Sequence, residues 1–503
     1  MKAYTLSISR FLPLALAAAV TVPLFCATDA FASDASSAPD LSADSLSSGA
    51  EFGSSTAGVL SSVGKQRTGE RIVYDSVDER GETVRVSGAL FDVDNAKGLV
   101  ALAPGTRGMG VHCAPSSPKN GVSSLSGSSV NVNYEAPVVR LLNDAGYRVV
   151  VTDYMGLGER GTVRTHTYLN RIDQGHALID AARHTARENE KVAFWGYSQG
   201  GGAAAAAAEL AADYAPELHV VGTFAGAPPG DPLRVLDQPS GALLTTVAGF
   251  GVIGFSDSNP EFKTAIEEVM TDEGLAMLDR LRTACVLDGP KIAPKPFEAY
   301  TKTGVSLAQL ARSDERISSV LARNALGHAT TSAPIMVLTN PDDDLVPEPQ
   351  ATQLARDYCT IGAPVEYRKV LVPGTASAPL FTASSGGSSY PAKRFPGSGH
   401  AVPGVLQTKH AIAWLDDRFA GKEFTQVCPG EDTPVELTDE LNTELNSVEK
   451  TAVALGVLAA VAGIVGLGGW AAYNLGLIPS EWLAMVPQQW LGMIPPLPQL
   501  PPL

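Results

Sequence analysis

The sequence predicts an α/β protein, in which a mostly parallel central sheet is flanked by helices and carries an inserted helical cap. Apolar stretches typical of buried strands alternate with helical patterns between residues 70 and 225, and such alternation builds βαβ units and a parallel sheet. The alternation pauses after Asp231. A mostly helical sequence pattern, at about residues 232–330, separates this point from the next apolar strand. We therefore expect the cap there.

The individual elements follow from local patterns. A wholly apolar run at 98–103 is typical of a strand with both faces covered, and Gly146 ends an amphipathic helical pattern. Strands are predicted at 70–77, 83–91, 98–103, 147–152, 191–195, 218–225, 334–339 and 364–371. Helices are predicted at 134–145, 171–187, 201–210, 348–358 and 402–420.

Composition excludes one large class of function. Charged residues make up 18% of the chain, and the formal net charge is −16 with no basic stripe. Because nucleic-acid binding needs clustered Lys and Arg, we expect no nucleic-acid partner.

The N-terminus has the pattern of an export signal. Lys2 and Arg10 precede an apolar run at 11–25, and Ala30 to Ala32 offers an A-x-A cleavage site. We therefore predict a signal peptide at 1–32, removed from an exported protein. Residues 33–62 are rich in Ser and Ala without apolar periodicity, and we expect a disordered linker there.

Four cysteines remain after that cleavage: Cys113, Cys285, Cys359 and Cys428. An even number in an exported protein indicates disulfides, because the compartment is oxidising. The residue pattern alone leaves the pairing open.

The C-terminal part departs from a globular pattern. An acidic linker at 429–450 leads into 451–472, which carries no charge and is long enough to cross a hydrocarbon core of about 30 Å. Residues 473–503 form a Trp- and Pro-rich tail. We expect a hydrophobic C-terminal helix at 451–472 that anchors the protein in a membrane or the cell envelope. Burial in an envelope layer or self-association is the alternative, and a buried core helix comes third.

The stretch from Lys191 to Leu210 organises the chain. The strand pattern KVAFW precedes Gly196-Tyr197-Ser198-Gln199-Gly200, and an alanine-rich helical pattern follows. A serine on such a strand-to-helix turn presents its hydroxyl at the top of a sheet. GxSxG by itself is weak, but this context makes Ser198 the candidate nucleophile.

A serine hydroxyl needs a base, and the base needs an orienting carboxylate. Asp343 follows the strand at 334–339 and begins a D-x-x-V-P arrangement, so we choose it over Asp342 and Asp344. A solvated turn or a calcium loop is the alternative for this acidic run.

Of the eight histidines, His400 alone fits a loop between the last strand and the last helix. The earlier histidines, His166 among them, are interpreted as structural.

The oxyanion hole should combine two backbone N–H groups. One is that of Gln199, directly after the nucleophile, and the other comes from the loop after the strand at 98–103. In that loop we choose Thr106, with Gly105 as the second choice.

Together these pieces resemble the secretory lipase family of α/β-hydrolases, which includes fungal and actinobacterial members. The matching motifs are PGTRG with the following CAPS, DYMGLG, GYSQGGG, DDDLVP and GSGH, and we interpret the chain as an actinobacterial member with its α/β-hydrolase domain at 63–428. The resemblance implies two disulfides, Cys113–Cys285 and Cys359–Cys428. It also implies hydrolysis of acyl esters, triacylglycerols included, under an apolar cap. Apolar cap residues such as Phe250, Val252 and Phe255 either line that site or pack as core.

We therefore predict an exported serine esterase or lipase, secreted or envelope-anchored, that requires no metal or organic cofactor. An envelope acyltransferase using the same triad is one alternative. A catalytically inactive, membrane-anchored binding protein is another. The oligomeric state and the acyl chain length stay open.

Overall fold

The structure is a computed structural model that describes residues 69–117, 123–126, 129–159, 165–238, 241–371, 398–430 and 435–436. All of these belong to one compact unit, Phe52–Leu503. The predicted signal peptide, linker at 33–62, C-terminal helix at 451–472 and tail lie outside the described residues. Within the described part of the chain, every helix is too short or too polar to span a bilayer.

A nine-stranded sheet with the order β1-β2-β6-β3-β7-β8-β9-β10-β11 forms the centre of the described domain. The first two pairings, β1 with β2 and β2 with β6, are antiparallel, and the others are parallel. The predicted mostly parallel sheet is therefore confirmed. The strands are β1 (Glu70–Val77), β2 (Thr83–Phe91), β3 (Leu99–Ala103), β6 (Arg148–Thr152), β7 (Lys191–Tyr197), β8 (His219–Gly226), β9 (Ile335–Thr339), β10 (Val365–Leu371) and β11 (Val435–Glu436).

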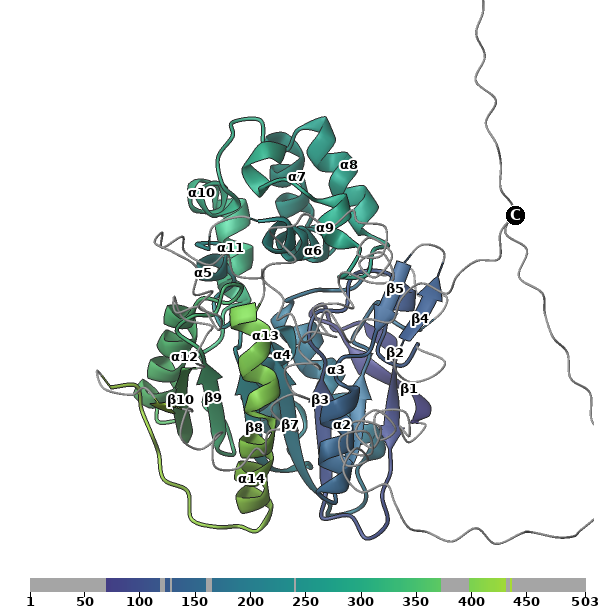
Figure 1. Ribbon diagram of the computed structural model, residues 1–503, viewed down its shortest axis with the longest axis vertical. Helices are drawn as coiled ribbons and strands as arrows, with labels where there is room; N and C mark the ends of the chain where they lie inside the picture. The colour runs from purple at the N-terminus through teal and green to yellow at the C-terminus, as the bar shows by residue number, and fades with distance from the viewer. Residues whose placement is uncertain are drawn as a thin grey trace, which may run out of the picture. The chain divides into compact units, whose positions relative to one another are not determined.

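Helices cover both faces of the sheet (Figure 1). Since successive strand residues point to opposite faces, Leu99 and Ala101 of β3 belong to a core cluster with α3 and α4. Val100 and Leu102 belong to a separate cluster with α2 and α14. The body helices are α2 (Ala136–Asp144), α3 (Arg171–Thr185), α4 (Gln199–Tyr214), α12 (Glu348–Thr360), α13 (Ser398–Leu406) and α14 (Thr408–Phe419).

The alanine run lies in α4 at the centre of the domain. Each alanine from Ala203 to Ala208 is at most 3% exposed. Ala203, Ala204 and Ala207 pack in the cluster with α3, and Ala205, Ala206 and Ala208 pack against β9 and α12. Small side chains let this helix approach the layers on both sides, which fixes the position of its first turn.

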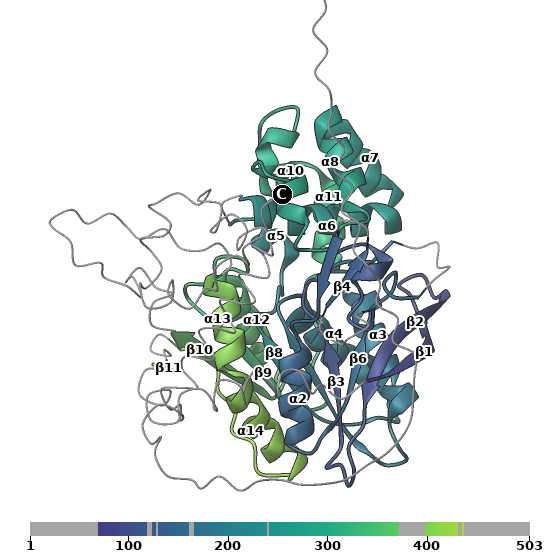
Figure 2. The same ribbon diagram turned by 45° about the vertical axis from the view of Figure 1, so that its right-hand side comes forward.

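The inserted segment forms a helical cap with a core of its own. Its helices lie together beyond one end of the sheet in both views (Figures 1 and 2). Phe250, Val252 and Phe255 are buried in the cap core, so packing explains these three residues. The cap elements are α5 (Pro232–Val235), α6 (Ala242–Ser258), α7 (Pro260–Val269), α8 (Asp272–Leu281), α9 (Gly289–Ile292), η2 (Phe297–Tyr300), α10 (Leu307–Ser313) and α11 (Glu315–Arg323).

Three features differ from the sequence prediction. The single helix predicted at 402–420 is two helices, α13 and α14, and α13 begins earlier, at Ser398. Pro403 lies inside α13, where it removes a backbone donor. A small hairpin, β4 (Ser123–Ser126) with β5 (Ser129–Val132), and a short helical turn, η1 (Val111–Cys113), were not predicted. Strand β11 pairs with β10 from within the segment expected to be an acidic linker.

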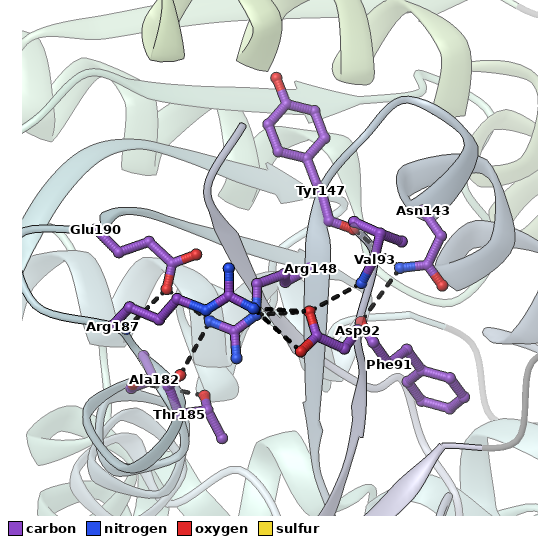
Figure 3. Close-up of polar contacts among 10 residues, drawn as sticks. All are labelled: Phe91, Asp92, Val93, Asn143, Tyr147, Arg148, Ala182, Thr185, Arg187 and Glu190. Atoms are coloured by element: carbon purple, nitrogen blue, oxygen red, sulfur yellow. Dashed lines mark hydrogen bonds and ion pairs between the residues drawn. The ribbon is translucent and has the colours of Figure 1, made fainter. Parts of the chain in front are cut away.

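A buried arginine holds the amino end of the parallel strands together (Figure 3). Arg148 opens β6, and its side chain is 5% exposed. Its guanidinium donates to Asp92 at 2.9 Å and to Glu190 at 2.6 Å, and to the carbonyl of Thr185 at 3.1 Å. The buried charge is therefore compensated.

Candidate active site

Ser198 lies on a strained turn between β7 and α4. Its backbone has φ 60° and ψ −126°, in the region that L-residues rarely adopt. The amide of Ser198 donates to the carbonyl of Gly226 at 2.9 Å, and its carbonyl accepts from Gly202 at 3.1 Å. The neighbouring layers thus hold the strain in place, as in a nucleophile elbow.

Three glycines let the backbone pass close to the serine. A Cβ on Gly196 would lie 1.9 Å from the carbonyl oxygen of Gly200. One on Gly200 would lie 2.1 Å from that of Ala103, and one on Gly201 would lie 2.2 Å from that of Gly226. The glycines of the motif are therefore required sterically. The contact with Ala103 also brings the end of β3 against the first turn of α4.

Asp343 and His400 form a buried acid–base pair. The His400 Nδ1 lies 2.8 Å from the Asp343 Oδ2. The other carboxylate oxygen accepts from the amides of Leu345 at 2.9 Å and Val346 at 2.8 Å. These amides belong to the D-x-x-V-P arrangement, and they fix the carboxylate toward the ring.

The charge of the ring is set by opposing effects. Burial disfavours the imidazolium, while the charge and hydrogen bond of Asp343 and the charge of Asp344 favour it. The net result is a raised pKa of His400. With its Nδ1–H directed to a carboxylate, the neutral ring keeps Nε2 free as a proton acceptor.

The turn that carries His400 is tied to the acid turn and to the elbow. Asn340 donates to the carbonyl of Gly399 at 2.8 Å, and the His400 amide donates to Asp344 at 3.1 Å. The hydroxyl of Tyr197, the residue before the candidate nucleophile, donates to the His400 carbonyl at 2.6 Å. The rings of Tyr197 and His400 lie 5.3 Å apart.

The structure therefore brings Asp343 and His400 together beside the residue that precedes Ser198. Within the described residues, Ser198 makes no side-chain hydrogen bond to His400. Such bonds are commonly long without substrate and tighten in the reacting complex. His400 lies in the first turn of α13, whereas the sequence prediction had put it on a loop.

The loop after β3 is held on both sides of the Thr106 amide. Gly105 donates its amide to the buried carboxylate of Glu135 at 2.7 Å. The Thr106 carbonyl accepts from the Tyr134 hydroxyl, and the Thr106 hydroxyl lies 2.7 Å from that of Tyr168. The Thr106 amide itself donates to nothing in the described part of the chain. This favours Thr106 over Gly105 as an oxyanion donor.

The second donor candidate, Gln199, is fixed through its buried side chain. Its Nε2 lies 3.0 Å from Nε2 of His166 and 2.8 Å from Oε1 of Gln174. His166 in turn contacts the carbonyl of Met155 through Nδ1 at 2.9 Å. Burial lowers the pKa of His166 to about 4, against the opposing effect of that carbonyl. The ring is thus neutral, and it accepts from Gln199.

Both disulfides have the pairing that the resemblance implies. Cys113–Cys285 joins the region after the β3 loop to the cap, and Cys359–Cys428 joins the end of α12 to the end of the domain. In the described ranges, the one group of three potential metal ligands is His112 with Cys113 and Cys285. Its two sulfur atoms are in the disulfide, so the described residues offer no metal centre there.

The groups that hold the site were not predicted from the sequence. His166 was interpreted as structural, and Tyr168, Glu135 and Arg107 were assigned no role. The buried guanidinium of Arg107 pairs with Glu135 at 3.1 Å, and Glu135 in turn accepts from the Gly105 amide, so the pair fixes the loop after β3. An arginine inside the otherwise small and uncharged PGTRG turn was a signal that could have revealed this pair.

Comparison with known proteins places this chain in a family. Residues 122–427, more than half of the chain, match the secretory lipase family. A probable inactive lipase of Mycobacterium tuberculosis is 27% identical over 255 residues, which is 50% of this chain and 51% of the relative. A secreted triacylglycerol lipase of Malassezia globosa is 26% identical over 334 residues, 63% of this chain and 62% of the relative. The chain thus spans between half and two thirds of these curated relatives.

Solved structures show the same fold. Candida antarctica lipase A superposes with a TM-score of 0.57 at 18% identity, over 77% of this chain and 85% of that chain. The rice cell wall degrading esterase of Xanthomonas oryzae superposes with a TM-score of 0.51 at 17% identity, over 72% and 94%. At these identities the likeness is evidence for the α/β-hydrolase fold alone.

Proposed function

Because the chain belongs to the secretory lipase family of α/β-hydrolases, we propose that it is an exported serine hydrolase of carboxylic esters. Ser198 is the nucleophile, His400 the base, Asp343 the orienting acid, and the amides of Gln199 and Thr106 the oxyanion donors. The observation that carries the proposal is the buried Asp343–His400 hydrogen bond of 2.8 Å, packed on Tyr197 next to the strained serine.

The first half of the reaction forms an acyl-enzyme. The Ser198 Oγ attacks the ester carbonyl carbon while its proton moves to Nε2 of His400. The Asp343 carboxylate stabilises the imidazolium, and the two amides stabilise the negative charge on the carbonyl oxygen. When the tetrahedral intermediate collapses, the C–O bond to the alcohol breaks, and His400 returns the proton to the leaving alcohol.

The second half releases the acid. Water gives a proton to His400 and attacks the acyl carbon through the same oxyanion arrangement. The bond to Ser198 then breaks, the serine takes back a proton, and the carboxylic acid leaves. Neither half needs a metal or an organic cofactor.

The proposed substrates are lipid esters such as triacylglycerols. The names of the fungal relatives support this class, since several are secreted triacylglycerol lipases. They also support export, in line with the signal peptide predicted at 1–32. Actinobacterial origin is supported by one mycobacterial relative. Envelope anchoring through 451–472 stays a prediction from the sequence.

One observation favours a second candidate, a catalytically inactive scaffold that binds ligands. A relative with 27% identity is named a probable inactive lipase. We favour the enzyme, because all three triad side chains are present here and two of them are hydrogen-bonded to each other.

Ser198→Ala tests the proposal against this rival. With p-nitrophenyl esters of increasing chain length, the wild-type chain should show turnover with a preferred length. The variant should lose at least about a thousandfold in kcat. Absence of turnover in both proteins would favour the inactive scaffold, and full turnover in the variant would exclude Ser198 as the nucleophile.

A further inference from the structure

The segment from Thr165 to Gln174 contacts both oxyanion donors. We propose that His166 and Tyr168 in this segment are positioning residues that jointly hold the Gln199 and Thr106 amides in the oxyanion hole. The inference rests on the proposed function. It goes beyond it because it assigns roles to two residues that do not touch the reacting atoms.

The His166 side forms a directed relay. A carbonyl can only accept, so the contact with Met155 puts the ring proton on Nδ1 and leaves Nε2 as the acceptor. Gln199 Nε2 then uses one hydrogen for His166 and the other for Gln174. Gln174 passes the chain on to the carbonyl of Asn170 at 3.2 Å. Each group in this hydrogen-bonded chain can act only as the donor or only as the acceptor toward its neighbour. The Gln199 side chain therefore has a single orientation that satisfies its contacts.

The Tyr168 side fixes the other donor. Its hydroxyl meets the Thr106 hydroxyl at 2.7 Å, and burial raises its pKa to about 12, so it stays protonated. Thr106 is thereby held at its side chain as well as at its carbonyl, where Tyr134 donates. The one polar group of Thr106 that these contacts leave available is the amide.

The two positioning residues also form one packed unit. The rings of His166 and Tyr168 meet edge-on, with centroids 5.9 Å apart, and His166 stacks on Tyr154 at 5.6 Å. His166 is 1% and Tyr168 4% exposed, and neither is a member of the triad. Packing alone would accept Phe at both positions. Packing therefore does not explain why the Tyr168 hydroxyl meets Thr106 and the His166 ring nitrogen meets Gln199. A positioning role for these polar atoms does.

Helix α6 of the cap rests on this unit. Phe250 meets the Tyr168 ring edge-on at 5.9 Å. A Cβ on Gly254 would lie 2.8 Å from the backbone nitrogen and 3.0 Å from the carbonyl oxygen of Tyr168. A shift of α6 would therefore press on the segment that holds both donors, which connects the cap to the oxyanion hole.

Tyr168→Phe is the direct test, because it removes one oxygen and keeps the ring. We expect kcat to fall about tenfold while KM stays within twofold of the wild-type value. Less firmly positioned amides bind the transition-state oxyanion less well but do not change binding of the ester in the ground state. The rate of inactivation by a p-nitrophenyl phosphonate diester should fall in parallel, because serine displaces p-nitrophenolate and the adduct puts a polarised phosphoryl oxygen in the same hole.

The matched control is Tyr367→Phe. It removes a buried tyrosine hydroxyl that lies 2.5 Å from the hydroxyl of Thr352, so it breaks the same kind of contact away from the proposed site. Its kcat and its phosphonate reactivity should stay at the wild-type values. Equal effects of the two variants would overturn the inference, as would a raised KM with unchanged kcat in Tyr168→Phe.

A second pair of variants tests the contact from the cap. Gly254→Ala should lower kcat and phosphonate reactivity, because the methyl group pushes on the Tyr168 backbone. Gly251→Ala on the same helix should change neither, since its Cβ would meet nothing closer than 4.0 Å. Wild-type kcat in Gly254→Ala would refute the connection. Failure of the proposed function stays distinguishable, because it would appear as absence of turnover in the wild-type chain or as full turnover in Ser198→Ala.

Discussion

The two ends of the sheet treat buried polar groups in opposite ways. At the amino end, the Arg148 guanidinium meets two carboxylates and a carbonyl. At the carboxyl end, the groups around the site are tied down. The amide of the half-buried Thr106 donates to nothing in the described part of the chain, and the amide of Gln199, the first residue of α4, has no partner within its helix. Because an unpaired polar group that is shielded from water costs free energy, we interpret these amides as reserved for a ligand. The contrast separates residues that stabilise the domain from residues proposed to react.

The largest expected effect on kcat, at the carboxyl end of the sheet, comes from replacing the carboxylate of Asp343. In Asp343→Asn the amide cannot stabilise the imidazolium, and it favours the wrong tautomer of His400. We expect kcat to fall by about 10³ to 10⁴ while the fold persists. Steady-state kinetics with p-nitrophenyl butyrate, together with thermal unfolding, measures both quantities.

Asp342→Asn is the matched control in the same acidic turn. It also removes one carboxylate, but not the one bonded to Nδ1 of His400, and kcat should stay within about threefold. If Asp342→Asn abolishes activity and Asp343→Asn does not, the choice among the three aspartates is wrong.

The amino end should respond in stability instead. Arg148→Met leaves Glu190, whose side chain is 9% exposed, without its buried partner. The free energy of unfolding should fall by about 3–5 kcal/mol, while kcat of the folded protein stays unchanged. Denaturant unfolding monitored by fluorescence gives the first quantity, and active-site titration followed by kinetics gives the second.

Arg187→Met is its surface counterpart. Arg187 contacts the same Asp92 at 3.2 Å, but its side chain is 55% exposed, so the loss should stay below about 1 kcal/mol. Equal losses at the two arginines would show that burial does not set the strength of this cluster. A drop in kcat for Arg148→Met would undo the separation of the two ends.

The same contrast explains what the sequence could predict. Strands β1 and β2 have the predicted bounds, because the turn residues from Asp78 to Gly81 mark where one strand ends and the next begins. The elbow was predictable because Gly196, Ser198 and Gly200 are close in sequence, and backbone crowding demands glycine there. The placing of Asp343 beside His400 needed the family order of the triad as well as the local motif.

What the sequence did not predict consists of partnerships between distant residues. Arg107 pairs with Glu135, and His166 meets Gln199, each across a separation that no local periodicity records. His400 was expected on the loop before the last helix, yet it lies in the first turn of α13, a helix that contains Pro403. There Asn340 and Asp344 bind the backbone of Gly399 and His400. Tertiary contacts override local propensity at that point.

The smallest predicted effect concerns pH. His400 must be neutral to accept the serine proton, so kcat/KM should fall about tenfold per pH unit below its pKa. Because Asp343 and Asp344 outweigh burial and raise that pKa above 6.5, the acid limb should begin above pH 6.5.

Removing the Asp344 charge in Asp344→Asn disfavours the imidazolium and lowers the pKa of His400, while the amide oxygen can still accept from the His400 backbone. The midpoint of the limb should therefore move to lower pH by less than about one pH unit, and a pH profile of kcat/KM measures it. A shift to higher pH would contradict the sign of this interaction, and an unmoved midpoint would mean that Asp344 acts on His400 through its backbone contact alone.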